Sequence, residues 1–232
     1  MKKIILTTII AIIATVGGFS VVYKNLNQNE KNSVISTNEK LEEKNIYHTE
    51  YQTSYSFDLK NLDEMYDNHE FIAIVHIDRL NPATTYREKT DEYIKPYTSG
   101  KATILKTLKG NFNSSEITFL RLGGIVSYTD YEKSLYPSAR EKLNELFQGD
   151  KTTTFVEDKS KDDIDIEDGK TYLVYMNRDN EFHNENEYTI EAFEYGLREV
   201  NLNTNTRSLN INSNEILIKN NKTNEYESID KA

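Results

Sequence analysis

Residues 71–77 read Phe-Ile-Ala-Ile-Val-His-Ile, and this apolar run decides the fold class. Side chains alternate between the two faces of a strand, so the odd-numbered residues would share one wholly apolar face. The other face carries Ile72, Ile74 and His76 and is mixed. A short run rich in isoleucine and valine, with this alternation, predicts a β-strand that lies in a hydrophobic core.

More strands are predicted downstream of this run. Residues 98–108 and 116–122 have strand character, and Gly110-Asn111 between them tolerates the positive φ that a turn needs. The two segments predict an antiparallel hairpin, which Gly123-Gly124 ends. Residues 170–176, Lys-Thr-Tyr-Leu-Val-Tyr-Met, are the strongest candidate after residues 71–77. Three further candidates lie at residues 187–200, 207–211 and 215–218.

Two short helices and one long loop complete the predicted pattern. Leucines and a tyrosine recur at helical spacing behind Asp58, a residue type that often caps helix N-termini. Residues 137–147 predict the second helix, with Ser138 as a candidate cap. Residues 81–96 are predicted to be a long polar loop, and residues 148–163 are polar and acidic. Short strands around two helices predict a mainly β (α+β) domain containing a small antiparallel β-barrel.

The N-terminal segment has the length and the flanks of a membrane span. Residues 4–23 are uncharged and mostly apolar, and a helix of roughly 20 such residues crosses the hydrocarbon core of a bilayer. Two lysines precede the run and favour a cytoplasmic N-terminus. These features predict a membrane anchor over residues 1–24, with residues 24–232 outside the cytoplasm. Secretion after cleavage near Ser20 is the alternative, because signal peptides share the same charge and length signals.

Composition divides the rest of the chain. Residues 25–55 are rich in Asn, Lys and Glu and bury too little apolar surface to offset chain entropy, so they predict a flexible tether. Residues 56–225 predict one β-rich extracytoplasmic domain, and residues 226–232 a tail. Because the chain has no cysteine, a hydrophobic core must hold this domain without disulfides. Attachment through a lipidated cysteine is excluded for the same reason.

The net charge argues against one class of partner. The formal net charge is −10 at pH 7, and residues 1–24 contribute three lysines and no acid, so the remainder carries −13. A groove for nucleic acid needs clustered lysine and arginine. Nucleic acid is therefore not an expected partner. The expected partners are an envelope protein or glycan, and the membrane itself through residues 4–23.

Three segments together resemble a known group of proteins. They are the helix that leads into residues 71–77, the hairpin from Ala-Thr-Ile-Leu-Lys-Thr-Leu-Lys-Gly-Asn (102–111) to Ile-Thr-Phe-Leu-Arg-Leu-Gly-Gly (117–124), and Asp-Gly-Lys-Thr-Tyr-Leu-Val-Tyr-Met (168–176). The series is similar to a loose group of exported, uncharacterised proteins of Gram-positive bacteria. The resemblance covers residues 58–200 and implies an OB-like barrel, shaped like the netrin and metalloproteinase-inhibitor modules. Those modules begin at a free cysteine and carry disulfides, so inhibition of metalloproteases does not carry over to this chain.

His76 and Asp78 are the candidate site residues. Both would project from one face of the strand, which permits an acid–base pair or a metal site. A polar residue on the mixed face of a barrel strand is the alternative, and two ligands without a third predict no metal site. The acidic run at residues 162–169 does not match a calcium-binding loop, because Asp168 stands where glycine is needed and Val174 where a bidentate acid is needed. An edge strand or a solvated loop explains this run better.

The expected function follows from location more than from chemistry. No serine-nucleophile elbow, Walker loop, dinucleotide fingerprint or zinc-protease motif occurs in the sequence. We expect a membrane-tethered extracytoplasmic binding or interaction module without a cofactor. Tyrosines in predicted loops would supply contact area for a protein or glycan, or half-buried packing beneath the loops. The alternative is a cell-envelope hydrolase, or a weakly metal-dependent enzyme, that uses His76 and Asp78.

Overall fold

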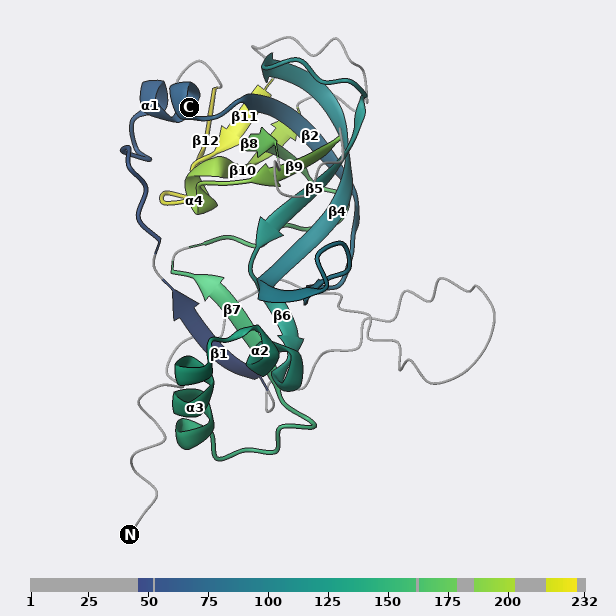
Figure 1. Cartoon of the computed structure of the whole chain (residues 1–232). Coiled ribbons are helices and arrows are strands. Elements are labelled where there is room, and N and C mark those ends of the chain that lie inside the picture. The colour runs from purple at the N-terminus through teal and green to yellow at the C-terminus, as the bar shows by residue number, and fades with distance from the viewer. Residues whose placement is uncertain (1–45, 52, 162, 179–185, 203–215, 229–232) are drawn as a thin grey trace.

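The computed structural model describes residues 46–51, 53–161, 163–178, 186–202 and 216–228, and within them the chain is mainly β, as predicted. The strands are β1 (Ile46–Tyr51), β2 (Phe71–Leu80), β3 (Thr84–Arg87), β4 (Glu92–Lys109), β5 (Glu116–Leu122), β6 (Gly124–Ser127), β7 (Phe155–Ser160), β8 (Thr171–Arg178), β9 (Glu187–Ile190), β10 (Leu197–Leu202), β11 (Ile216–Lys219) and β12 (Tyr226–Ser228). The helices are α1 (Leu62–Asn68), α2 (Tyr128–Ser134), α3 (Pro137–Leu146) and α4 (Phe193–Gly196). Figure 1 shows a larger β-rich part above a smaller part that contains β1, β6, β7, α2 and α3.

Strand β2 lies inside the larger sheet, which confirms the strand predicted from residues 71–77. It pairs antiparallel with β8 on one side and with β4 on the other. Beyond β4 come β5 and, parallel to β5, strand β9, which also pairs with β8. The hydrogen-bonded pairs therefore lead from β8 through β2, β4, β5 and β9 back to β8. Strand β10 pairs with the first half of β8, and β11 and β12 follow beyond it.

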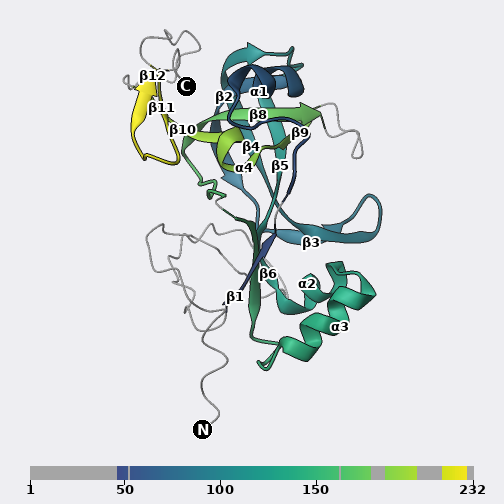
Figure 2. The same cartoon turned by 90° about the vertical axis from the view of Figure 1, so that its left-hand side faces the viewer.

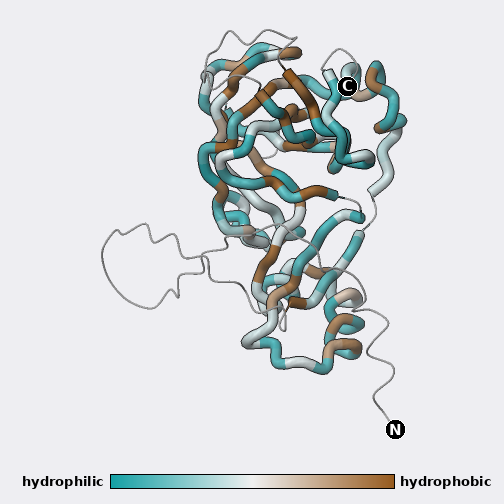
Figure 3. Tube along the Cα trace, turned by 180° about the vertical axis from the view of Figure 1, so that it is seen from behind, coloured by the Kyte–Doolittle hydropathy of each residue, from teal (hydrophilic) through white to brown (hydrophobic). Residues whose placement is uncertain are grey.

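Two hydrophobic clusters cover the two faces of β2. The odd-numbered side chains of residues 71–77 lie in the first cluster, together with Phe119 of β5. Ile72 and Ile74 lie in the second, which helix α1 covers. Figure 3 shows apolar residues recurring along the strands of this sheet. Because each fully buried aliphatic or aromatic side chain contributes roughly 1.5–3 kcal/mol, β2 is a principal source of stability, and His76 is the partly exposed exception within the run.

Strand β4 is longer than predicted and takes part in two hairpins. Its middle pairs with β5 as the sequence predicts, and Gly110 has a φ of +84° at the turn. Its first part pairs antiparallel with β3, so the prediction of a loop over residues 81–96 is wrong. The rings of Tyr86 and Tyr93, which face each other across this pair, lie 5.3 Å apart. Cross-strand aromatic pairs of this kind stabilise an exposed hairpin that lacks an apolar pattern.

Strands β1, β7 and β6 form a separate three-stranded sheet in that order, seen from the side in Figure 2. Strand β1 pairs in parallel with β7, so residues 46–51 belong to the folded part and the predicted tether over 25–55 is corrected at its C-terminal end. The backbone partners of β1 come from 109 residues later in the chain, Ile46 pairing with Phe155, which the local composition cannot reveal. Strand β7 likewise lies within residues 148–163, a polar and acidic stretch in which the sequence predicted no strand. Strand β12 pairs with β11, so the predicted tail at 226–232 begins inside a sheet.

Both predicted helices are present, but their caps differ from the prediction. Helix α1 is capped by Asn61, whose side-chain oxygen accepts hydrogen bonds from two N–H groups of the first turn, and not by Asp58. Helix α3 begins at Pro137 without a side-chain cap, so the prediction of Ser138 as the cap is wrong. Helix α2, capped by Ser127, was not predicted, because its buried side chains are tyrosines and not aliphatic residues. The single-turn helix α4 was not predicted either.

The predicted membrane span over residues 1–24 lies outside the described residues, as does the predicted strand at 207–211. Within the described ranges, no helix is long and apolar enough to cross a membrane. The anchor, and the cleaved form as its alternative, therefore stay predictions from the sequence.

Candidate functional site

His76 and Asp78 both lie on β2, where each has its own hydrogen-bond partner. His76 is half-buried, with its Nδ1 3.3 Å from Oγ1 of Thr171. Asp78 is exposed and accepts a 2.7 Å hydrogen bond from Oγ1 of Thr103. Among the residues that the structure describes, no group of three His, Cys, Asp or Glu side chains could hold a metal ion. The structure thus adds no third metal ligand to this pair within the described ranges, and the enzyme alternative stays a prediction.

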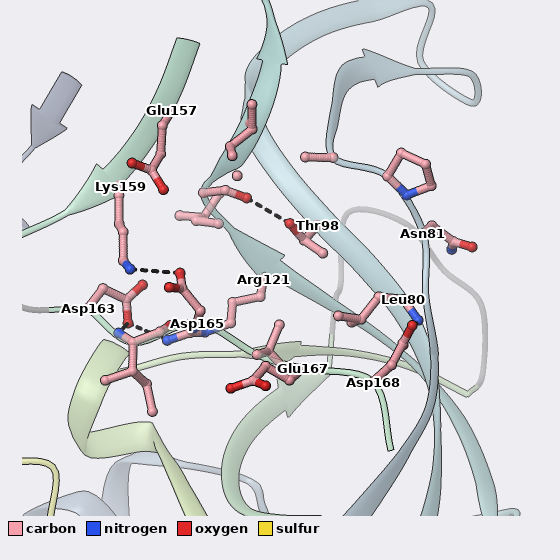
Figure 4. A pocket seen from close by; sticks show the side chains of 18 residues that line it. Leu80, Asn81, Thr98, Arg121, Glu157, Lys159, Asp163, Asp165, Glu167 and Asp168 are labelled. Atoms are coloured by element: carbon pink, nitrogen blue, oxygen red, sulfur yellow. Dashed lines mark hydrogen bonds and ion pairs between the residues drawn. The ribbon is translucent and has the colours of Figure 1, made fainter. Parts of the chain in front are cut away.

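A pocket lies where the larger sheet meets the three-stranded sheet, and Figure 4 shows the side chains around it. Its volume is about 350 Å³, and small-ligand sites span roughly 300–1,000 Å³. One wall is the end of β2 and the loop that follows, from Leu80 to Ala83. Strands β6 and β7 form the second wall, and the segment of residues 163–168 forms the third. Apolar side chains such as Ile125 and Ile166 stand beside carboxylates in this lining.

Two glycines let the walls of the pocket approach each other. Gly123 and Gly124 connect β5 to β6 with φ values of +100° and +138°, which L side chains rarely adopt. A Cβ on Gly124 would lie 2.5 Å from Cβ of Ala83 and 2.8 Å from Oγ1 of Thr98. The oxygen Oγ1 of Thr98 also donates a 3.0 Å hydrogen bond to the carbonyl of Gly123. The Gly-Gly pair therefore ends the predicted strand and also lets the loop after β2 pack against the start of β6.

A buried ion pair holds the first end of the acidic segment 163–168. Arg121 of β5 bonds through Nη2 to the carboxylate of Asp163 and donates through Nη1 to the carbonyl of Ile164. The side chains of Arg121 and Asp163 are only 7% and 3% exposed, so water screens the pair very little. Burial raises the pKa of Asp163, while the neighbouring guanidinium lowers it. The ion pair fixes this wall of the pocket to β5.

Two further contacts hold the other end of the segment. The hydroxyl of Tyr172 accepts a 3.1 Å hydrogen bond from the backbone N–H of Glu167. Burial raises the pKa of Tyr172 to about 12, so its hydroxyl stays protonated at neutral pH. Asp168 accepts a 2.5 Å hydrogen bond through Oδ1 from the backbone N–H of Leu80, which joins the segment to the loop wall. The acidic segment is thus a loop that these contacts hold at both ends, with the Asp163 side chain buried and Asp168 exposed.

Carboxylates outnumber cations around the pocket. The acidic lining residues are Glu157, Asp163, Asp165, Glu167 and Asp168, and the basic ones are Arg121 and Lys159. Five carboxylates and two cations give the lining a net formal charge of −3. Nζ of Lys159 lies 2.7 Å from Oδ1 of Asp165, and Nδ1 of His48 lies 2.6 Å from Oε2 of Glu157. A cleft lined mainly by one sign of charge concentrates counter-ions, so the pocket presents apolar surface within a negative potential.

Another buried carboxylate lies on the opposite face of β7 from the lining residues Glu157 and Lys159. Asp158 is 5% exposed and accepts a 2.7 Å hydrogen bond from Oγ1 of Thr49. Burial raises its pKa above the ordinary value of 3.8, against hydrogen bonds from Thr49 and Tyr131 that lower it. Asp158 therefore ties both β1 and α2 to the central strand of the small sheet.

The variant Asp158→Asn should gain stability relative to the wild type as the pH rises. A raised folded-state pKa means that the folded protein binds this proton more tightly than the unfolded chain does. Below the unfolded-state pKa of Asp158, the carboxyl group is neutral in both states and no charge has to be buried. The cost of burying the charged carboxylate grows as the pH rises toward the folded-state pKa, and it is constant above that pKa. Thermal unfolding of both proteins from about pH 3 to about pH 8 measures this difference around the ordinary carboxyl value. A difference in midpoint that does not change across the range would contradict the assignment.

The sequence contains one signal for this pocket, at Arg121. With a strand period of two, Arg121 falls on the same face of β5 as Ile117 and Phe119, which predicts a buried acidic partner. That partner, Asp163, lies in the acidic run for which the sequence favours an edge strand or a solvated loop. The rest of the lining comes from stretches that are separate in the sequence and share no local pattern.

Comparison of the chain with protein-family models, with curated proteins and with solved structures found no match. The resemblance noted in the sequence therefore stays a prediction. The proposals below rest on the predicted anchor and on the geometry of the pocket.

Proposed function

We propose that this chain is a membrane-tethered extracytoplasmic binding module whose ligand site is the pocket between the two sheets. The observation that carries the proposal is the pocket of about 350 Å³, in which apolar side chains stand beside carboxylates. The apolar run of residues 4–23 behind two lysines supports the location, with residues 24–232 outside the cytoplasm. Cleavage near Ser20 would release the same binding domain in secreted form.

An OB-like barrel of β2, β4, β5, β8 and β9 is part of the same proposal. The pairings that lead through these strands and back to β8 support it, as does the parallel pair of β5 and β9. OB folds bind their ligands with a strand face and with the loops beside it, including the loop between the first two strands. Here the corresponding loop contains Pro82 and Ala83, which line the pocket. The charge of −13 outside residues 1–24 favours an envelope protein or glycan over nucleic acid as the partner.

A matched pair of substitutions tests the pocket as the ligand site. Leu122 lines the pocket and is 42% exposed, whereas Leu146 of α3 is 57% exposed and is not part of the lining. Leu122→Trp adds bulk to the pocket, and Leu146→Trp adds the same bulk elsewhere on the surface. After crosslinking and capture from intact cells, we expect Leu122→Trp to recover about tenfold less partner, which corresponds to about 1.4 kcal/mol. Leu146→Trp should recover the wild-type amount.

Equal recovery by the two tryptophan variants, both shown to be folded by circular dichroism, would contradict the pocket as the ligand site. Loss of capture in both variants would place the contact surface beyond the pocket and would count against the proposal in the same way.

A further inference from the structure

We propose that the pocket selects an organic cation, namely an ammonium or guanidinium group on a short aliphatic stem. The inference rests on the proposed function in using the same pocket, and it adds the chemical class of the ligand. Two independent features of the lining carry it: the apolar walls, and the way in which the lining charges are already paired.

The apolar walls fit an aliphatic stem. Leu80 and Pro82 line one side of the pocket, Ile125 lines the β6 side, and Ile164 and Ile166 come from the segment that closes it. A stem of a few methylene groups would gain free energy of binding from every group that these side chains remove from water. A small hydrated ion would gain nothing from them. The long side chains of lysine and arginine combine such a stem with a charged head.

The pairing of charges leaves the head of such a ligand with carboxylate partners. Both cations in the lining are engaged within it, because Arg121 pairs with Asp163 and Lys159 pairs with Asp165. The lining therefore holds no further cation for Glu157.

The lining holds no further cation for Glu167 or Asp168 either. Glu167 pairs with Lys170 and Glu157 with His48, and neither Lys170 nor His48 belongs to the pocket lining. The Lys170–Glu167 ion pair and the His48–Glu157 hydrogen bond both reach the solvent, where such contacts contribute little stability, so a ligand cation can compete for the two carboxylates. Asp168 holds the N–H of Leu80 through Oδ1. Figure 4 shows that Glu157 and Glu167 enter the site from different elements, β7 and the acidic segment.

The arrangement of the acids favours an organic cation over a metal ion. A metal ion needs several ligands that converge on one point, and the described residues contain no group of three His, Cys, Asp or Glu side chains that could hold one. Acids spread around an apolar space suit a ligand whose charge is delocalised or carries several N–H donors.

The test uses the full chain in an uncharged detergent and three small probes of similar size: n-butylammonium, n-butanol and butyrate. Methyl NMR of isoleucine reports on the site directly, because Ile125, Ile164 and Ile166 line the pocket. We expect n-butylammonium to shift these methyl signals, and butyrate to leave them unchanged. The neutral alcohol should bind at least about tenfold more weakly than the ammonium, which is the effect of about 1.4 kcal/mol of charge interaction.

Two double variants with the same change in net charge separate the pocket from the general negative charge of the chain. Glu157→Gln with Glu167→Gln removes two lining carboxylates, and Glu141→Gln with Glu145→Gln removes two exposed carboxylates on α3. We expect the first double variant to weaken n-butylammonium binding about tenfold, as the loss of a partly desolvated charge contact does. The control should bind it as the wild type does.

The outcomes test the ligand class separately from the pocket as a ligand site. Equal binding of butanol and butylammonium, or equal weakening by both double variants, overturns the cation class while the pocket remains a ligand site. A failure of all three probes to shift the pocket methyl signals also overturns the cation class, and the two tryptophan variants then test the proposed function separately.

A peptide that carries one lysine, compared with the free amine, identifies the source of the cation. Tighter binding of the peptide indicates a protein partner, and tighter binding of the amine indicates a small molecule.

Discussion

Arg121→Ala is expected to lower the free energy of unfolding by about 3–5 kcal/mol, the usual result of removing one partner of a buried ion pair. The loss is large because the carboxylate of Asp163 would stay buried without its cation, and the carbonyl of Ile164 would lose its donor. Urea unfolding of a fragment that starts at residue 45, without the predicted anchor, followed by circular dichroism, measures the loss. The matched control is Arg79→Ala, since Arg79 is exposed on β2, and its effect should stay within about 0.5 kcal/mol.

The pH dependence and a double variant separate the buried charge from lost packing. In Arg121→Ala the pKa of Asp163 is no longer lowered by the guanidinium, so protonation at acidic pH should relieve part of the loss. Replacing both partners together, with Arg121→Met and Asp163→Leu, should recover most of the stability, because no charge is then left buried. A loss below about 1 kcal/mol for Arg121→Ala at neutral pH would contradict a buried pair, since exposed ion pairs give values of that size.

Phe119→Ala should cost about 3–5 kcal/mol, the range for large-to-small substitutions of aromatic residues in a core. Phe119 is fully buried in the cluster that also contains the odd-numbered face of β2. It stands opposite Gly100 of β4, where an added Cβ would lie 2.5 Å from Cζ of the ring. Because the ring fills the space that glycine leaves, alanine at position 119 would open a cavity between β4 and β5.

Leu122→Ala is the control for Phe119→Ala, because it removes an apolar side chain from the end of the same strand, where the residue is 42% exposed. Its cost should stay below about 1 kcal/mol. If Phe119→Ala fails to fold, Phe119→Leu gives a smaller loss that urea unfolding can still measure. Similar losses for Phe119→Ala and Leu122→Ala would show that Phe119 does not lie in the main core.

The central strands of the fold could be predicted from the sequence because their signal is local. Residues 71–77 and 170–176 are apolar enough to be recognised alone, and Gly110 marks the turn between β4 and β5. Strands β1 and β7 gave no such signal, because each is half polar and finds its partner far away in the sequence. Strand β3 and helix α2 pack through tyrosine side chains, so the spacing of aliphatic residues does not predict them.

The pocket was harder to predict than the strands, because its walls meet only in the folded chain. Gly123-Gly124 was recognised as the end of a strand, but the close approach of Ala83 to Gly124 depends on the path of the loop after β2. Arg121 was visible as a charged residue on an apolar face, yet its partner Asp163 lies 42 residues later. The predicted site residues His76 and Asp78 lie on β2, where each contacts a threonine, and neither lines the pocket.

Labelling of a single cysteine in intact cells tests most directly the claim that the binding domain lies outside the cytoplasm. The chain has no cysteine, and Ser138 is exposed on α3, so Ser138→Cys offers one reactive site. A membrane-impermeant maleimide should label Ser138→Cys in intact cells, and the labelled protein should stay in the membrane fraction. A cysteine placed on an N-terminal extension should react only after the cells are permeabilised. Protection of Ser138→Cys until permeabilisation would contradict the extracytoplasmic location, and labelled protein in the medium would contradict the anchor.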